Sequence, residues 1–104
     1  REVELLPLDV LRRRGLLERT LRHELAHVAT GAALAGRARW VQEGVAQYVA
    51  GERTRRASPR DAACPSDAEF AAARSAGELA GLYARALACV ERAVAAGADW
   101  RTIR

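Results

Sequence analysis

The chain contains no methionine and no lysine, and it has only two histidines, two cysteines and few aromatic residues (two Trp, two Tyr and one Phe). Alanine dominates its apolar half, so we expect a thin core built from close contacts between helices. No C-x-x-C pair is present, which excludes a zinc knuckle. No run reaches the roughly 18 apolar residues that a membrane span needs. With a length of 104 residues, the chain is expected to form one small domain over residues 1–104.

The missing methionine also means that the chain lacks an initiator of its own. We expect either a processed product or, in preference, a domain excised from a longer protein. No signal peptide is visible, and an excised domain would not show one. We expect the domain to be a monomer.

The net charge of +4 arises from seventeen basic residues, all of them arginine, and thirteen acidic ones. Such a surplus raises the question of binding to nucleic acid or to a membrane surface. Apart from short clusters at 12–14 and 53–56, the arginines are spread along the chain without interleaved aromatic residues. We therefore expect a solvated arginine-rich surface and no nucleic-acid partner.

Both histidines lie in one short segment, 23–27, which reads H-E-x-x-H within a stretch that should be helical. Residues four apart lie on one face of an α-helix, about 5–6 Å apart at Cβ. His23 and His27 can therefore bind one metal ion, with Glu24 beside them. In this arrangement two histidines hold Zn²⁺ and the glutamate activates a metal-bound water. The alternative is a pair of surface histidines on a helix.

A catalytic zinc site usually has three protein ligands and one open position. A metzincin would continue the motif as H-x-x-G-x-x-H, but Thr30 and Ala33 stand at the glycine and histidine positions. An aspzincin would offer a downstream G-T-x-D segment, which the sequence lacks. The third option is a glutamate on a following helix. Glu43 meets it, with fifteen residues between it and His27 and with Gly36 to turn the chain.

The segments R-H-E-L-A-H-V-A-T-G (22–31) and R-W-V-Q-E-G-V-A-Q-Y (39–48) resemble the gluzincin metallopeptidases, above all the bacterial peptidase-MA-like domains. The resemblance covers residues 16–51, and the remainder matches only as a helical pattern. Gluzincin domains usually carry a β-sheet ahead of the metal helix, and only residues 3–8 remain here to supply one.

The resemblance implies that His23, His27 and Glu43 are zinc ligands and that Glu24 is the general base. It also implies that the substrate is a peptide or a protein. The alternative for Glu43 is an ordinary solvated glutamate, or one that the helix macrodipole favours at a helix N-terminus.

The resemblance also suggests roles for three further residues, namely Gln47, Tyr83 and Arg85. Related enzymes often place an acidic residue one turn after the third ligand, where this chain has Gln47. Its amide either accepts an imidazole N–H, with less effect than a carboxylate, or lies at the surface. Tyr83 is on a later helix where many gluzincins place a catalytic tyrosine, and we assign it as oxyanion donor, with Arg85 in reserve. A core tyrosine is the alternative for Tyr83. Tyr48, about 140° around its helix from Glu43, should face away from the metal.

In the N-terminal half, residues 1–8 alternate weakly, which predicts a short strand or an extended lead-in. Asp9 is expected to cap a short turn that Gly15 ends. A helix over 16–34 follows. Its apolar positions predict one buried stripe, made of Leu17, Leu21, Leu25, Val28 and Ala32.

In the C-terminal half, we expect helices at 40–50, 67–74 and 76–96, with a charged, proline-containing loop at 52–65. The last two helices should begin with capping boxes, Ser66 with Glu69 and Ser75 with Glu78. Gly51 and Gly97 should end the helices that precede them. The buried face of the last helix is expected at Leu79, Leu82, Tyr83, Ala86, Leu87, Val90 and Val94, followed by a closing turn with Trp100 and Ile103.

The two cysteines, Cys64 in the loop and Cys89 in the last long helix, can form one pair. A disulfide between them would stabilise a small core by about 2–4 kcal/mol. It would also point to an extracytoplasmic or secreted location. Two free cysteines are the alternative.

Taken together, the patterns predict a mainly α, zincin-like metal-binding subdomain of two metal helices and a long C-terminal helix. Its predicted activity is zinc-dependent peptide-bond hydrolysis with a glutamate as general base. The rival from another class is a non-catalytic binding or structural domain that retains the pair of zinc helices.

Overall fold

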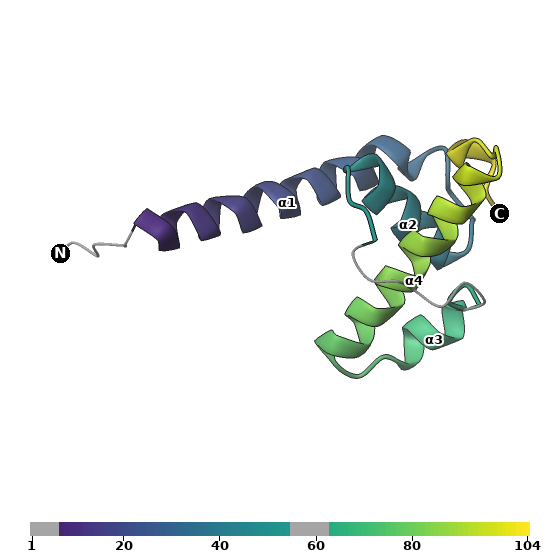
Figure 1. Ribbon diagram of the computed structural model, residues 1–104. Coiled ribbons are helices and arrows are strands. Elements are labelled where there is room, and N and C mark those ends of the chain that lie inside the picture. The colour runs from purple at the N-terminus through teal and green to yellow at the C-terminus, as the bar shows by residue number, and fades with distance from the viewer. Residues whose placement is uncertain (1–6, 55–62) are drawn as a thin grey trace.

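The computed structural model describes residues 7–54 and 63–104. This part of the chain forms four α-helices and a terminal 3₁₀ turn, namely α1 (Pro7–Gly31), α2 (Arg39–Val49), α3 (Asp67–Ala72), α4 (Ala76–Ala95) and η1 (Trp100–Thr102) (Figure 1). The described residues contain no strand. The predicted mainly α fold is therefore confirmed.

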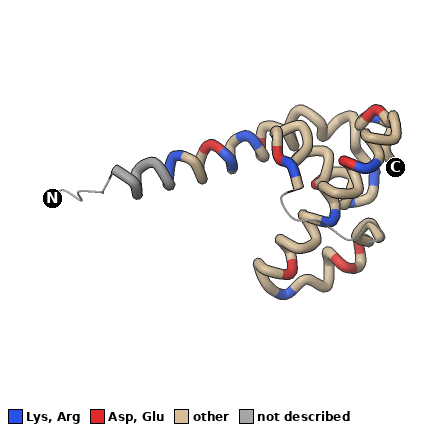
Figure 2. Tube along the Cα trace, in the orientation of Figure 1, with Lys and Arg blue, Asp and Glu red and all other residues tan. Residues whose placement is uncertain are grey.

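Helix α2 packs against both α1 and α4. Figure 1 shows the N-terminal part of α1 projecting away from the other helices, and the molecule measures 52 × 27 × 24 Å along its principal axes. Basic and acidic residues are interspersed along α1 and over the other helices (Figure 2). The body of the domain is formed by the C-terminal part of α1 together with α2, α3 and α4.

The predicted N-terminal strand and separate capped turn are wrong for the described residues. Pro7 and Leu8 already lie in α1, which continues without a break through Asp9 and Gly15; residues 1–6 lie outside the described part. Proline suits the first helical position because its missing N–H would have no helical partner there. A glycine inside a helix costs only about 1 kcal/mol relative to alanine, and the neighbouring leucines and arginines are good helix formers.

The predicted buried stripe of the first helix is also wrong. Its large members are exposed, with Leu17 at 59%, Leu21 at 51%, Leu25 at 65% and Val28 at 80%. Ala32, just beyond the end of α1, is exposed as well. The buried positions are Ala26 and Thr30, on the face that also carries the histidines and that α2 covers. Periodicity identifies an apolar face, but packing decides which face is covered.

Two apolar clusters form the core. The larger cluster consists of Leu34, Val41, Val45, Val90 and Ile103. The smaller cluster joins α3 to α4 and consists of Phe70, Leu82 and Ala86. The predicted apolar face of α4 is confirmed, with Leu79, Tyr83 and Val94 half-buried at its edges. The closing turn is confirmed by the burial of Ile103.

Helices α2 and α4 approach each other most closely at a glycine. A Cβ atom added to Gly44 would lie 2.5 Å from the carbonyl oxygen of Ala86 and 2.7 Å from Cγ2 of Val90. Only a residue without a side chain fits this position unless the two helices move apart. Because Gly44 directly follows Glu43, this contact also helps to fix the position of the Glu43 backbone relative to α4.

Both helices that follow the loop begin with the predicted serine cap. Ser66 and Glu69 form a complete capping box. Ser75 accepts the backbone N–H of Glu78, but the Glu78 carboxylate accepts the N–H of residue 74, so the second box is only half formed. Each cap satisfies a backbone N–H that would otherwise lack a helical partner.

Arg85 ties α3 to α4. Its guanidinium donates to Glu69 at 2.7 Å and to the carbonyl oxygen of Ala63 at 2.9 Å. The hydrogen bond from Arg85, followed by the backbone bond from Ser66, holds the pKa of the exposed Glu69 carboxyl below its usual value. Arg85 is thus engaged by α3 and by the chain that precedes it.

Cys64, just before α3, and Cys89, within α4, lie at disulfide distance, with their Cα atoms 5.8 Å apart. Of the predicted loop, residues 52–54 and 63–65 have no regular secondary structure, and residues 55–62 lie outside the described part. Within the described ranges, no helix has the length and the apolar character that crossing a membrane requires.

Candidate metal centre

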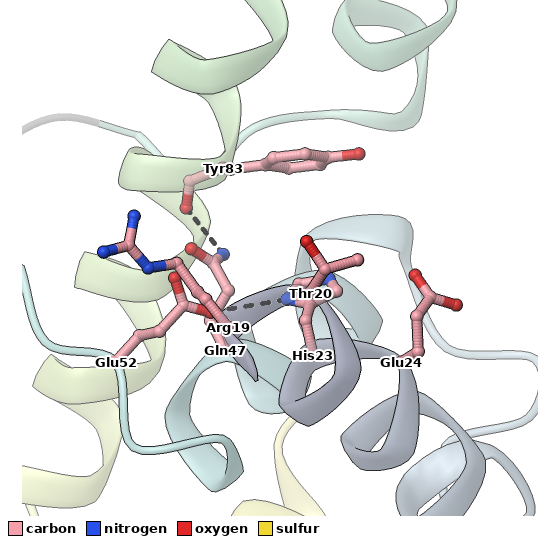
Figure 3. A pocket seen from close by; sticks show the side chains of 7 residues that line it. All are labelled: Arg19, Thr20, His23, Glu24, Gln47, Glu52 and Tyr83. Carbon is pink, nitrogen blue, oxygen red and sulfur yellow. Dashed lines mark hydrogen bonds and ion pairs between the residues drawn. The ribbon is translucent and has the colours of Figure 1, made fainter. Parts of the chain in front are cut away.

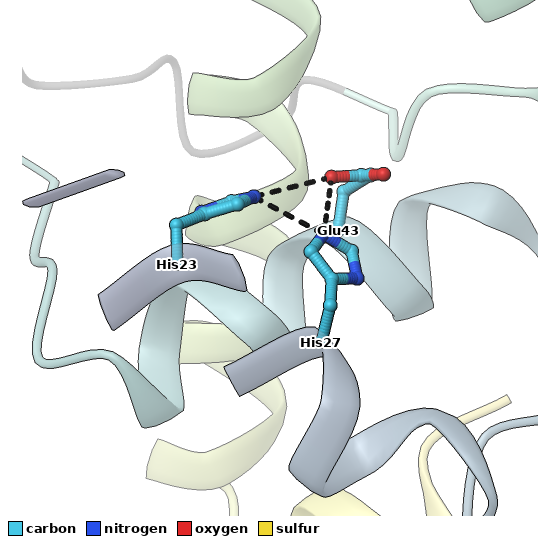
Figure 4. Close-up of side chains that lie close together, drawn as sticks. All are labelled: His23, His27 and Glu43. Carbon is cyan, nitrogen blue, oxygen red and sulfur yellow. Dashed lines mark hydrogen bonds and ion pairs between the residues drawn. The ribbon is translucent and has the colours of Figure 1, made fainter. Parts of the chain in front are cut away.

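Three side chains from α1 and α2 converge on one point (Figure 4). His23 and His27 come from successive turns of α1, and Glu43 comes from α2. Nε2 of His27 lies 3.1 Å from Nε2 of His23 and 3.0 Å from Oε1 of Glu43, and the third edge, from His23 Nε2 to Glu43 Oε1, measures 3.5 Å. The structure thus brings together the three residues that the sequence predicts as ligands, and the group could hold a metal ion.

The dimensions of this triangle suit a small tetrahedral cation. Zinc bonds to nitrogen and oxygen measure about 2.0–2.2 Å, so two tetrahedral ligand atoms lie about 3.3–3.6 Å apart. The observed edges of 3.0, 3.1 and 3.5 Å are close to that separation. A single proton can bridge one edge of the triangle, whereas one cation at its centre would account for all three.

The side chains of the triangle are partly shielded from solvent. Glu43 is 13% exposed, His23 22% and His27 31%. Nε of Arg39 lies 3.9 Å from Oε2 of Glu43, the carboxylate oxygen that is not part of the triangle. Partial burial strengthens the attraction between the carboxylate and a cation, while the remaining exposure leaves a route for a ligand.

The connection between α1 and α2 explains how Glu43 reaches the histidines. Leu34 is buried in the core, and its backbone N–H donates to the carbonyl of Thr30 at 3.0 Å, which prolongs the end of α1. Gly36 then adopts a φ of +78°, a value that glycine tolerates best, and reverses the chain. The N–H of Arg39, at the start of α2, donates to Asp67 at 2.8 Å. This short turn lays α2 back along α1.

A cavity of about 240 Å³ opens beside the triangle. Figure 3 shows the seven residues that line it, Arg19, Thr20, His23, Glu24, Gln47, Glu52 and Tyr83. Glu24, the predicted general base, is exposed and lines this cavity together with His23. The cavity therefore lies where His23, a candidate metal ligand, and Glu24 are both accessible, as is common for small-molecule sites.

Tyr83 lies across the cavity from His23 and Glu24 (Figure 3). Its ring centroid is 6.5 Å from that of His23 and 6.0 Å from that of Phe70. The half-buried ring therefore packs on the smaller core cluster and also borders the cavity. By contrast, Tyr48, which the sequence predicts to face away from the metal, packs against the larger core cluster and does not line the cavity.

The structure gives Gln47 neither of its two predicted roles. This side chain is buried, and its amide donates to the backbone carbonyl of Tyr83 at 2.9 Å, linking α2 to α4. The partner of His23 is Glu52, whose carboxylate accepts the ring Nδ1–H at 3.3 Å. Glu52 lies beyond the end of α2, so a helical spacing counted from Glu43 does not find it. The G-E pair at 51–52, just after the C-cap of α2, is the sequence signal that indicates it.

Comparisons of this chain with protein-family models, with curated proteins and with solved structures find no match.

Proposed function

We propose that this domain is a zinc-dependent peptide hydrolase. The observation that carries the proposal is the triangle of His23, His27 and Glu43, whose edges suit zinc, next to a cavity lined by Glu24. The H-E-x-x-H segment and the following W-x-x-E-G segment support the same assignment through their resemblance to the gluzincins.

When bound, zinc would polarise the scissile carbonyl and lower the pKa of a nearby water molecule. The chain's own residues supply the proton transfers. Glu24 accepts the proton of the attacking water and delivers it to the leaving amine as a general base and then a general acid. Tyr83, across the cavity, donates its hydroxyl hydrogen to the oxyanion that forms on the substrate.

The test compares the parent protein with Glu24→Gln in hydrolysis of a peptide library, with zinc supplied and zinc content measured in both. An amide cannot accept the water proton, so the variant should keep about one equivalent of zinc and lose about 10²–10⁴-fold in rate. Glu18→Gln is the matched control, because Glu18 is an exposed glutamate of the same helix that does not line the cavity. It should behave like the parent protein.

A second variant tests the metal ligands separately. His27→Ala removes one corner of the triangle and should abolish stoichiometric zinc binding, because two ligands cannot hold zinc tightly. Full zinc content in His27→Ala would contradict the metal assignment. Zinc binding without any peptide hydrolysis by the parent would instead identify the domain as non-catalytic.

We also propose that the domain works outside the cytoplasm. The support is the pair of cysteines at disulfide distance, because disulfides persist mainly in oxidising compartments. Quantifying free thiols in protein recovered from its native source tests this point, and two free thiols would contradict it.

A further inference from the structure

His23 makes contacts through both of its ring nitrogens. Its Nε2 atom faces His27 and Glu43 (Figure 4). Its Nδ1–H donates to Oε2 of Glu52 at 3.3 Å (Figure 3). A proton on Nδ1 leaves the lone pair on Nε2, the atom that faces the triangle. The bond to Glu52 therefore favours the tautomer of His23 that can bind a metal ion through Nε2. Among the described residues, Nδ1 of His27 has no comparable partner.

The position of Glu52 is built into the end of α2. Gly51 adopts a φ of +89° after the helix, and its N–H donates to the carbonyl of Tyr48 at 3.1 Å. The N–H of Glu52 donates to the carbonyl of Gln47 at 3.0 Å. These two bonds form a Schellman motif, the common ending of a helix at a glycine. The motif turns the chain so that the residue after the glycine lies beside α1.

The residues that follow Glu52 are tied to neighbouring helices. Thr54 donates its backbone N–H to Glu91 of α4 at 3.1 Å and its hydroxyl to the same carboxylate. Arg53 donates to the carbonyl of Tyr48 at 3.2 Å, and its guanidinium stacks over the Tyr48 ring. Glu52 is therefore held from both sides along the chain, unlike a glutamate on a free surface loop.

We infer that Glu52 is the positioning residue for the metal ligand His23, an inference that rests on the proposed zinc-dependent function. A carboxylate that accepts the free N–H of a ligating histidine fixes the ring orientation and raises the basicity of the other nitrogen. In the gluzincins that the sequence resembles, a residue one turn after the third ligand often has this role, and Gln47 stands at that position here. The amide of Gln47, however, donates to the carbonyl of Tyr83. Glu52 reaches the same histidine from the end of the same helix.

The first experiment measures zinc affinity by competition with a chelator in the whole chain. Removing such a partner typically weakens metal binding by about 10–100-fold, so Glu52→Ala should show a loss in this range. Glu52→Gln keeps an acceptor oxygen without the charge and should lie between Glu52→Ala and the parent protein. Glu18→Gln, which makes the same change of net charge on an exposed glutamate, should bind zinc like the parent.

The second experiment reads the tautomer of His23 directly, by long-range ¹H–¹⁵N NMR of the metal-free protein at a pH where the ring is neutral. The parent should show a proton on Nδ1, and Glu52→Ala should show a mixture of tautomers. A merely structural role for Glu52 would not change the tautomer of one ring.

Two results would overturn the inference: zinc affinity unchanged in Glu52→Ala, or a His23 tautomer that is indifferent to Glu52. If the parent protein binds no zinc but its His23 tautomer depends on Glu52, the proposed metal function fails while the contact itself stands. The two experiments together therefore distinguish failure of the inference from failure of the proposed function.

Discussion

At the scale of single residues, the question is which side chain near the cavity can donate a hydrogen bond to the oxyanion. If both histidines bind metal, neither is free to donate to an oxyanion, so any hydrogen-bond donor in addition to the metal has to be another residue. Arg85, the reserve candidate, is occupied by Glu69 and by the carbonyl of Ala63. Tyr83 borders the cavity, and within the described part of the chain its hydroxyl makes no hydrogen bond. Tyr83 is the better candidate because its hydroxyl is available to a substrate.

Replacing Tyr83 by Phe tests this assignment. The substitution removes the hydroxyl but keeps the ring that packs on Phe70, so the melting temperature and the zinc content should barely change. Loss of one oxyanion donor should lower kcat by about 10²–10³-fold, measured on the best peptide from the library. A drop in melting temperature without a change in kcat would make Tyr83 a core residue only.

At the scale of elements, the packing of α2 on α4 sets the positions of Glu43 and Tyr83 relative to each other. Helix α2 carries Glu43 toward α1 and Gln47 toward α4, where Gln47 bonds to the carbonyl of Tyr83. Gly44 lets the two helices approach until a Cβ would overlap with the backbone of Ala86. A change in this spacing would displace Glu43, a candidate metal ligand, and Tyr83, the candidate oxyanion donor, relative to each other.

Gly44→Ala should therefore destabilise the domain, although alanine is the better helix former by about 1 kcal/mol. We expect a net loss of roughly 1–3 kcal/mol, because the atoms that meet the new Cβ belong partly to backbone and cannot rotate away. Urea denaturation measures the difference. Gly81→Ala on α4 is the control, since nothing lies within 4 Å of its Cβ position, and it should stabilise the helix. Equal stabilisation of both variants would show that α2 and α4 can separate without cost.

At the scale of the whole molecule, α1 is a long helix of which only the C-terminal part joins the body (Figure 1). Its large apolar residues from Leu17 to Val28 are mostly exposed, so they contribute little to holding it in place. The triangle of His23, His27 and Glu43 bridges α1 to α2, with two candidate ligands on one helix and one on the other. A bound cation would thus act as a cross-link between the projecting helix and the core.

Zinc should consequently raise the melting temperature of the parent protein. A ligand that binds only the folded state stabilises it by about 2.7 kcal/mol at one hundred times its dissociation constant. For a domain of this size that corresponds to a rise of roughly 10 °C or more. Circular dichroism melts with zinc and with a chelator, under conditions that keep any disulfide intact, measure the effect. His27→Ala should show no rise, and an equal rise in that variant would place the stabilising metal elsewhere.

The sequence by itself determined the local features of this protein. The serine caps, the glycine helix ends at Gly51 and Gly97, the apolar face of α4 and the H-E-x-x-H spacing depend on residues close together in the chain. Helical geometry relates such residues directly, so patterns of three or four residues suffice to predict them. The same reasoning failed at the start of α1, where Asp9 and Gly15 carry turn signals that a continuous helix overrides.

Only the tertiary structure decided which surfaces meet. The apolar stripe of α1 is exposed because α2 covers the histidine face, a choice that periodicity alone cannot make. The partners of Gln47 and His23, namely the carbonyl of Tyr83 and the carboxylate of Glu52, lie 36 and 29 residues away along the chain. Contacts of that separation depend on how whole helices pack and where they end. The physical reason is that local sequence sets the direction of each side chain, whereas packing sets what that side chain meets.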